Sequence, residues 1–245
     1  MPKVLLNNID HQELRLNTRG GREFGDGVNQ VLVFPTEFEP AQREFPIIFR
    51  PDSDGRLRPV ALLGLDRDEN LFLGPDGRWQ SDHVPALLQS GPFAIAASSS
   101  HSGDGDLQVL IDLDHPRISL TEGAPLFLEH GGNSPALDKL LGVLRAAYMG
   151  HRLLDPLIEA LNGAGLLRPF DLQLRVGPDR AYAISDAHTI DRERLAGLTG
   201  EELATLHRSG FLQSAFMIAA SLGNLQRLVD RKSARLAAAP GTAAA

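Results

Sequence analysis

Cysteine is absent from the 245-residue chain, and its absence excludes several kinds of chemistry. Without cysteine there is no disulfide, no thiolate nucleophile and no cysteine-ligated zinc. A metal ion would therefore have to bind His, Asp or Glu side chains. Clustered basic residues are absent too, and the formal net charge is -7. Because phosphate backbones are bound by clustered Lys and Arg, nucleic acid is not an expected partner.

Long hydrophobic runs are also missing. The apolar run that begins at Val4 spans only three residues, which is far shorter than the core of a signal peptide. The longest apolar stretch, from Phe211 to Leu225, is interrupted by polar residues and is too short for a membrane span. The sequence therefore predicts a cytoplasmic protein that is not an integral membrane protein. It leaves open an association with the cell surface that needs no signal peptide.

The overall composition is that of a globular protein, with 42% hydrophobic and 22% charged residues. We predict a single domain over residues 1–236, with a β-rich part over about 1–130 and a mainly helical part over about 134–236. Residues 237–245 are predicted to be a disordered tail. The expected fold class is α+β, in which short antiparallel strands of the N-terminal half pack with a C-terminal helical region that contains one hairpin.

In the N-terminal half, short apolar runs punctuated by Gly, Pro, Asp and Asn predict strands and turns. A polar hairpin turn is expected between the second and third strands, a short helix within residues 80–93, and a polar loop over residues 98–106. The expected strands are residues 31–35, 45–49, 59–65, 70–74, 93–97 and 107–113.

In the C-terminal half the hydrophobic period becomes helical. Ser134 can cap a helix whose first residue is Pro135, and this helix either ends at Gly150 or kinks and continues. Residues 170–176 and 181–185 flank a turn and predict a hairpin. Thr199 and Glu202 have the spacing of a capping box. A last helix is expected to begin near Phe211 and to run to about residue 236.

The stretch at residues 63–79 has the alternating oxygen ligands that begin a calcium loop, at Asp66, Asp68 and Asn70. An EF-hand loop also needs Gly at position 6 and an acid at position 12. Counting from Asp66, these places hold Leu71 and Gly77. The calcium pattern therefore fails, and we interpret the stretch as a polar turn with Trp79 folding back on the sheet.

The strongest catalytic candidates follow the last predicted strand. Asp112 and Asp114 would share one strand face, next to His115, and His130 stands in a glycine-rich stretch further on. Two carboxylates on one face could bind a hard cation or act as acid and base. The alternative is a solvated strand edge and turn. Glu129 and His130 also precede a helix N-terminus that could bind an anion, although capping by Ser134 explains the same residues.

Several motifs in order resemble the SapC family of bacterial proteins over nearly the whole chain. They include "FPTEF" (34–38), "FPIIF" (45–49), "VPALLQSGPF" (84–93), "GAPLFLEHGG" (123–132) and "GFLQSAFMIAASLGNLQRL" (210–228). The resemblance implies an accessory role in surface-layer or TonB-dependent receptor systems and supplies no catalytic residues. Its motif positions, taken as binding candidates, are Glu37, Asn70, Trp79 and Asn224.

One departure from the family pattern is visible. The family usually has Tyr-Ile-Pro-Ala followed by Arg-Arg-Tyr-Pro-Phe, where this chain has His83 and Val84 and then Gln89, Ser90 and Gly91. An arginine-dependent role at this place is therefore in doubt for this chain.

Three functional hypotheses follow. We favour a non-catalytic accessory or binding protein whose partners belong to a surface-layer or TonB-dependent receptor system, with no cofactor and no metal. The alternative is a metal-dependent enzyme that modifies a peptide or envelope component, and it requires Asp112, Asp114, His115 or His130 to converge in one pocket. A third hypothesis, an exported surface-layer component, is weakened by the lack of a signal peptide.

Overall fold

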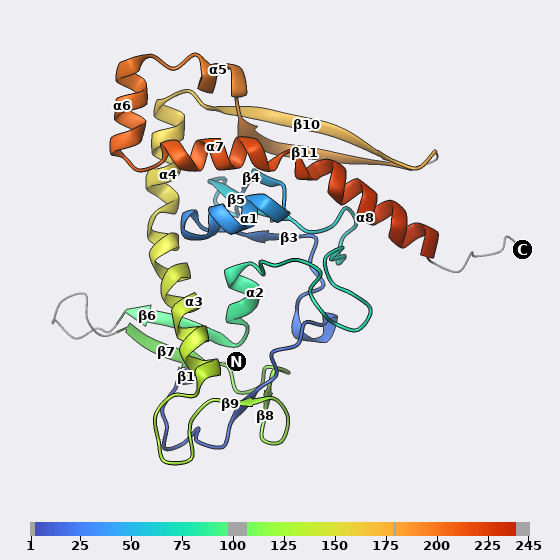
Figure 1. The fold of residues 1–245 in the computed structure, drawn as a ribbon. Helices are drawn as coiled ribbons and strands as arrows, with labels where there is room; N and C mark the ends of the chain where they lie inside the picture. Colours follow the sequence, from blue (N-terminus) through green and yellow to red (C-terminus); the bar gives the residue numbers. More distant parts are fainter. Residues whose placement is uncertain (1–2, 98–106, 179, 239–245) are drawn as a thin grey trace, which may run out of the picture.

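The computed structural model describes residues 3–97, 107–178 and 180–238. Three antiparallel sheets and a set of C-terminal helices make up the molecule, which confirms the predicted α+β fold (Figure 1). The predicted polar loop at residues 98–106, with His101, Asp104 and Asp106, lies outside the described residues.

The largest sheet has five strands in the order β10-β11-β4-β5-β3. The hairpin of β4 and β5 was predicted, and so was the hairpin of β10 and β11. The pairing of these two hairpins in one sheet was not predicted. Strand β11 pairs with β4 at a single residue pair, His188 with Phe49. The C-terminal hairpin thus extends a sheet that the N-terminal half begins. The strands are β3 (Gln30–Leu32), β4 (Ile47–Pro51), β5 (Leu57–Leu62), β10 (Leu167–Val176) and β11 (Arg180–Ile190).

Two smaller sheets lie at the other end of the molecule, beside the N-terminal part of α3 (Figure 1). Their orders are β1-β7-β6 and β8-β2-β9. A second hydrophobic core around Ile111, Leu126 and Leu137 fills the space between these sheets and α3. The strands are β1 (Val4–Leu5), β2 (Arg15–Leu16), β6 (Phe93–Ala97), β7 (Leu107–Ile111), β8 (Ile118–Ser119) and β9 (Ala124–Pro125).

The predicted helix caps are present. Ser134 Oγ accepts a hydrogen bond from the backbone N–H of Leu137 and caps α3 (Pro135–Arg152), which breaks only at Leu153 before α4 (Leu154–Gly163). Thr199 and Glu202 form the capping box of α6. The short helix predicted within residues 80–93 is α2. The bounds of α2 and α6 are Ala86–Ser90 and Gly200–Arg208. Four further elements are the 3₁₀ turns η1 (Arg22–Phe24) and η2 (Pro35–Glu37) and the helices α1 (Phe38–Glu44) and α5 (Arg192–Ala196).

The prediction of one last helix was wrong, because the segment forms two: α7 (Leu212–Ser221) and α8 (Asn224–Ala238). Polar side chains at the break bind the sheet end instead of continuing the helix. Ser221 Oγ accepts from the N–H of Ile47 at 2.9 Å, and Asn224 Nδ2 donates to the carbonyl oxygen of Phe45 at 3.2 Å. Of the predicted tail, residues 237–238 end α8, and residues 239–245 lie outside the described residues.

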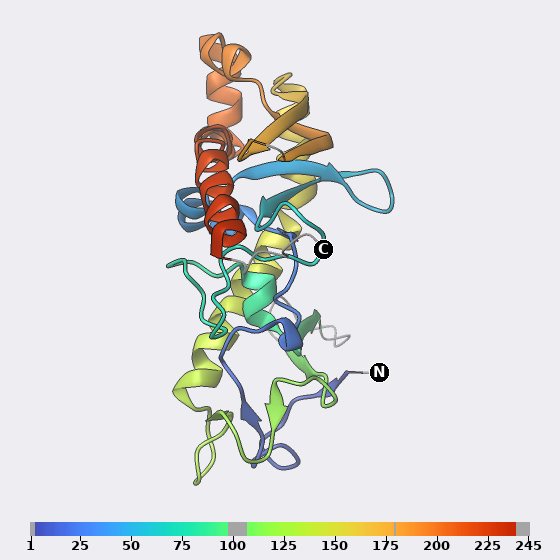
Figure 2. The ribbon, with the colours of Figure 1, turned by 90° about the vertical axis from the view of Figure 1, so that its right-hand side faces the viewer.

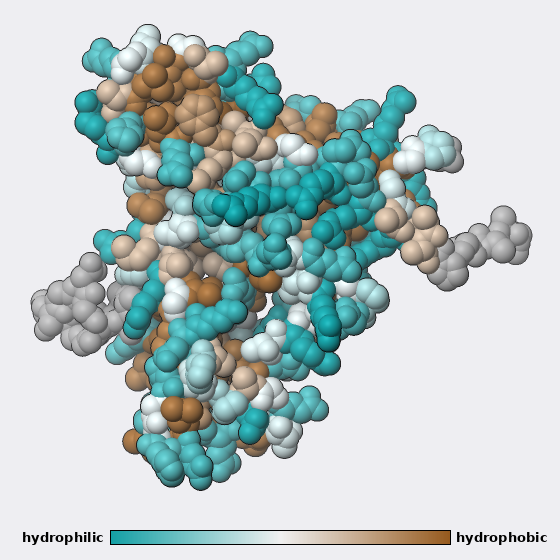
Figure 3. All heavy atoms as spheres, viewed as in Figure 1, coloured by the Kyte–Doolittle hydropathy of each residue, from teal (hydrophilic) through white to brown (hydrophobic). Residues whose placement is uncertain are grey.

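Helices α7 and α8 lie against the five-stranded sheet and cover the main core (Figures 1 and 2). This core holds the largest fully buried side chains, among them Phe38, Phe45, Phe49 and Phe72. Hydrophobic surface gathers over the end formed by α6 and α7, where Phe216 is 53% exposed (Figure 3).

Candidate functional site

Residues 63–80 fold against α8, and the strand predicted at residues 70–74 was wrong. Its backbone bonds are local: Asn70 Oδ1 accepts from the N–H of Phe72 at 2.9 Å, and the N–H of Gly74 donates to the carbonyl of Arg78. Only one isolated bridge, between Leu73 and Trp79, keeps a β-type pairing. The side chain of Asn70 satisfies the backbone in place of a neighbouring strand, which favours a turn. Trp79 folds back on this turn through its bridge with Leu73 and packs against the main core, whereas the sequence predicted that it folds back on the sheet.

Asn70 connects this turn to two other segments. It is buried, and its Nδ2 donates to the carbonyl oxygen of Asp26 at 2.9 Å. Its own carbonyl oxygen accepts from Arg235 Nη1 on α8 at 2.9 Å. Both polar atoms of the Asn70 side chain therefore form hydrogen bonds that hold the turn in place.

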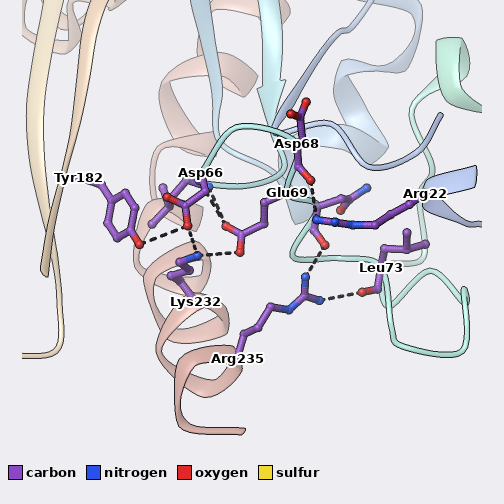
Figure 4. A network of polar contacts seen from close by, with 10 residues as sticks. Arg22, Asp66, Asp68, Glu69, Leu73, Tyr182, Lys232 and Arg235 are labelled. Atoms are coloured by element: carbon purple, nitrogen blue, oxygen red, sulfur yellow. Dashed lines mark hydrogen bonds and ion pairs between the residues drawn. The ribbon is translucent and has the colours of Figure 1, made fainter. Parts of the chain in front are cut away.

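A buried lysine joins the same turn to α8. Lys232 is 4% exposed, and its Nζ lies 2.5 Å from Asp66 Oδ2 and 2.7 Å from Glu69 Oε1 (Figure 4). It also lies 5.5 Å from the ring centroid of Tyr182 on β11. Burial lowers the pKa of Lys232, but hydrogen bonds to Asp66 and Glu69 outweigh this and raise its pKa above the ordinary value. One acid of the failed calcium pattern, Asp66, and the nearby Glu69 therefore bind an internal cation.

Arginines of α8 hold the rest of the turn without using a carboxylate. Arg235 Nη2 donates to the carbonyl oxygen of Leu73 at 2.7 Å, in addition to its bond to Asn70 (Figure 4). Arg231 Nη2 donates to the carbonyl oxygen of Gln80 at 2.9 Å, and its guanidinium lies 4.5 Å from the ring centroid of Phe72. Burial and the nearby Arg227 lower the pKa of Arg231.

These arginines face a groove of about 990 Å³ between α8, residues 19–23 and the turn at residues 74–77, which we call the arginine groove. On the opposite wall Arg22 Nη2 donates to the carbonyl oxygen of Asp68 at 2.5 Å, and Arg19 is exposed. Arg19 makes no side-chain hydrogen bond or ion pair with any described residue. The charged residues that line the groove are Arg19, Arg22, Arg231, Arg235, Glu23 and Asp76.

A second cavity, of about 200 Å³, lies beside the groove, and we call it the Trp79 cavity. Gly20 lines both spaces and lies tightly against Gly77: a β-carbon on Gly20 would be 2.5 Å from the Gly77 carbonyl oxygen. Gly77 has a φ of 76°, which favours glycine. The Trp79 cavity is lined by Leu16, Asn17, Thr18, Gly20, Trp79, Val84, Leu88, Gln89, Arg117, Ala136, Lys139, Leu140 and Val143.

Glu37, another family-motif position, is buried and has three partners. Its Oε2 accepts from the N–H of Ala86 at 2.8 Å and lies 2.9 Å from His83 Nε2, while its Oε1 accepts from the N–H of Phe34. It thus joins the segment before α2 to η2. His83 is the partner that completes this contact. Like Asn224 at the helix break, Glu37 holds backbone in place.

The four catalytic candidates do not line the arginine groove or the Trp79 cavity. Asp112, Asp114 and His115 lie in one turn after β7, where Asp112 Oδ1 accepts from the N–H of Asp114 and His115 Nδ1 accepts from the N–H of Arg117. Burial and Arg117 lower the pKa of His115. His130 is exposed on a separate loop after β9. Within the described residues, no three His, Asp or Glu side chains are grouped so that they could hold a metal ion.

Sequence reasoning missed Arg231, Lys232 and Arg235, although a signal was present. The apolar seam that begins at Phe211 reaches Val229, and three residues later the same face of the helix holds Lys232. A lysine on a buried helix face requires acidic partners, and in the structure these are Asp66 and Glu69 of residues 63–79. What the sequence did not indicate was that α8 would cross this turn.

A family model described as SapC matches residues 6–228, which is most of the chain. The chain belongs to the SapC family. The part matched to SapC contains Glu37, Asn70, Trp79 and Asn224, whereas Arg231, Lys232 and Arg235 lie beyond its end. Neither the curated proteins nor the solved structures contain a significant match to this SapC member. Over the part of the chain that the structure describes, no helix has the length and apolar character required to cross a bilayer.

Proposed function

We propose that this SapC member is a non-catalytic accessory protein of a surface-layer or TonB-dependent receptor system, and that it binds an acidic segment of a partner protein in the arginine groove. The observation that carries the proposal is the set of partners of Arg22, Arg231 and Arg235. All three guanidinium groups bind neutral oxygens or a ring, and none forms an ion pair with a described carboxylate. No described carboxylate therefore lies within ion-pair distance of these three groups, although the more distant charge of Glu44 acts on Arg231.

The acids of the groove do not change this balance. Asp76 Oδ2 lies 3.6 Å from Nε of Arg78, an arginine that does not line the groove. The other acid of the lining is Glu23, and the lining contains four arginines. The chain as a whole is acidic, so this groove is a local exception to its net charge of -7. A guanidinium has five N–H donors, and those not used by carbonyl groups are available for carboxylates. Several carboxylates in one extended segment would reach more of the arginines that line the groove than a single small anion would.

The test is a titration with fluorescein-labelled hexaglutamate, followed by fluorescence anisotropy. Arg19→Glu reverses a groove charge without removing any described side-chain contact, so we expect it to weaken binding about tenfold, equivalent to about 1.4 kcal/mol. The matched control is Arg145→Glu, which makes the same charge change on an exposed position of α3 away from the groove. An equal loss in both variants would show a non-specific charge effect and overturn the proposal.

Two further measurements separate the partner classes. Inorganic phosphate at the same charge concentration should compete only weakly with hexaglutamate, because it reaches fewer arginines at once; strong competition would favour a small-anion site. The link to a receptor or surface-layer system is tested by cross-linking in native cells. The wild type should be cross-linked to a protein of such a system and Arg19→Glu should not. Equal cross-linking of the wild type and Arg19→Glu would contradict a role for the groove.

A further inference from the structure

We infer that the Trp79 cavity is a separate binding site for a small amphiphilic carboxylate, a molecule with an apolar body and one acid group. The cavity lies where two hydrophobic cores meet. Trp79 and Leu88 pack against the main core, whereas Leu16 and Leu140 belong to the second core beside the small sheets. Ligand sites form preferentially between separately packed parts of a protein, such as domain interfaces, and the junction of two cores is a comparable place.

The walls of the cavity suit an apolar ligand body. Leu16 and Leu140 are buried in the second core, and Trp79 is half-buried and lines the cavity. The walls come from the segment after β2, from the chain around α2 and from α3. Since these elements are held by separate cores, the walls are supported from both sides and the site is formed before a ligand arrives.

Two cations line the cavity, and their surroundings differ. Arg117 Nη2 lies 2.7 Å from Asp26 Oδ2, and Nη1 donates to the carbonyl oxygens of Asn17 and Arg19. This buried arginine is already neutralised by Asp26 and holds the loop that forms one wall, while its Nε is buried and has no hydrogen-bond partner among the described residues. Lys139, by contrast, is exposed on α3 and makes no hydrogen bond or ion pair with any described residue. Its ammonium is therefore the cation that remains available to a ligand.

An apolar space with one available cation defines the ligand class. A neutral apolar molecule would use the walls alone, and an inorganic anion would use Lys139 alone. A carboxylate with a short apolar chain uses both, with its acid group near Lys139 and its chain against Trp79. The orientation follows from the positions of these two side chains, because an ammonium at the surface attracts the acid while burial favours the chain.

Trp79 is the only tryptophan in the chain, so its fluorescence reports on this cavity directly. We would titrate the full-length protein with octanoate and, separately, with octanol, which has the same chain length and no charge. Octanoate should change the Trp79 emission saturably, with a dissociation constant below about 1 mM, and octanol should bind about tenfold more weakly. The absence of a saturable change, or equal affinity for both compounds, would overturn the inference.

Three variants localise the effect. Lys139→Met should lower octanoate affinity to that of octanol and leave octanol binding unchanged, whereas the control Arg145→Met, also exposed on α3, should change neither. Val143→Phe fills the cavity and should abolish binding of both compounds, provided that circular dichroism shows an unchanged fold. Retention of both ligands by folded Val143→Phe would place the binding elsewhere and contradict the cavity. None of these outcomes depends on hexaglutamate binding, so the two proposals can fail separately.

Discussion

Two sides of α8 meet the same turn in different ways. Lys232 is buried and lies between two carboxylates, Asp66 and Glu69, whereas Arg231 and Arg235 on the neighbouring face are half-buried and bind carbonyl oxygens (Figure 4). The difference follows from solvent: a cation removed from water needs a counter-charge, while a guanidinium near the surface needs only hydrogen bonds. The lysine side of α8 therefore stabilises the fold through buried ion pairs, and the arginine side keeps positive charge available for a partner.

The largest expected effect comes from breaking the lysine side. Lys232→Met leaves Glu69, whose side chain is 10% exposed, without its buried counter-charge. We expect the free energy of unfolding, measured by urea denaturation, to fall by about 3 kcal/mol, the usual cost of stranding one partner of a buried pair. The double variant Lys232→Met with Glu69→Gln should recover part of this loss because it strands no full charge. A double variant no more stable than the single one would contradict a buried ion pair.

Much of the fold could be predicted because its signals are local. The cap at Ser134, the capping box of Thr199 and Glu202, and the hairpin of β4 and β5 depend on residues a few positions apart. The break between α7 and α8 could not be predicted in this way. Ser221 and Asn224 end α7 by bonding to the backbone of Ile47 and Phe45, which lie 174 and 179 positions earlier. Helical periodicity contains no information about such partners.

The arginine side should affect stability less and binding more. Arg235→Gln removes the charged donor to the carbonyl oxygens of Asn70 and Leu73, so we expect a loss of about 1.5 kcal/mol in the free energy of unfolding. Its affinity for hexaglutamate should fall about tenfold, while Lys232→Met, measured where it is folded, should keep wild-type affinity. Arg235→Lys serves as the control that retains the charge, and it should recover part of the affinity. If Arg235→Gln destabilises the protein more than Lys232→Met does, the contrast between the two sides is wrong.

The candidate site was less predictable than the fold. The sequence singled out Asn70 and Trp79, and each lies in the turn that borders a cavity or the groove. It assigned no role to Arg19 or Lys139, because an exposed cation has the same local sequence whether or not a counter-charge lies nearby. Such a role depends on what the fold leaves unpaired, and that becomes visible only when every distant neighbour is in place.

The smallest effect is expected at a half-buried counterpart of the buried pair, between Arg194 and Glu202. The hydrogen bond from Arg194, with those from the backbone and side chain of Thr199, lowers the pKa of Glu202 from 4.5 to about 2. Because the folded-state pKa lies below the unfolded one, this stabilisation is complete above pH 4.5 and is lost as the pH falls toward 2. Glu202→Gln should therefore lower the melting temperature slightly at pH 7 and flatten its acid dependence over this window. Glu201→Gln, an exposed neighbour in the same helical turn, is the matched control, and an equal response in both variants would mean that the capping box and Arg194 contribute no specific stability.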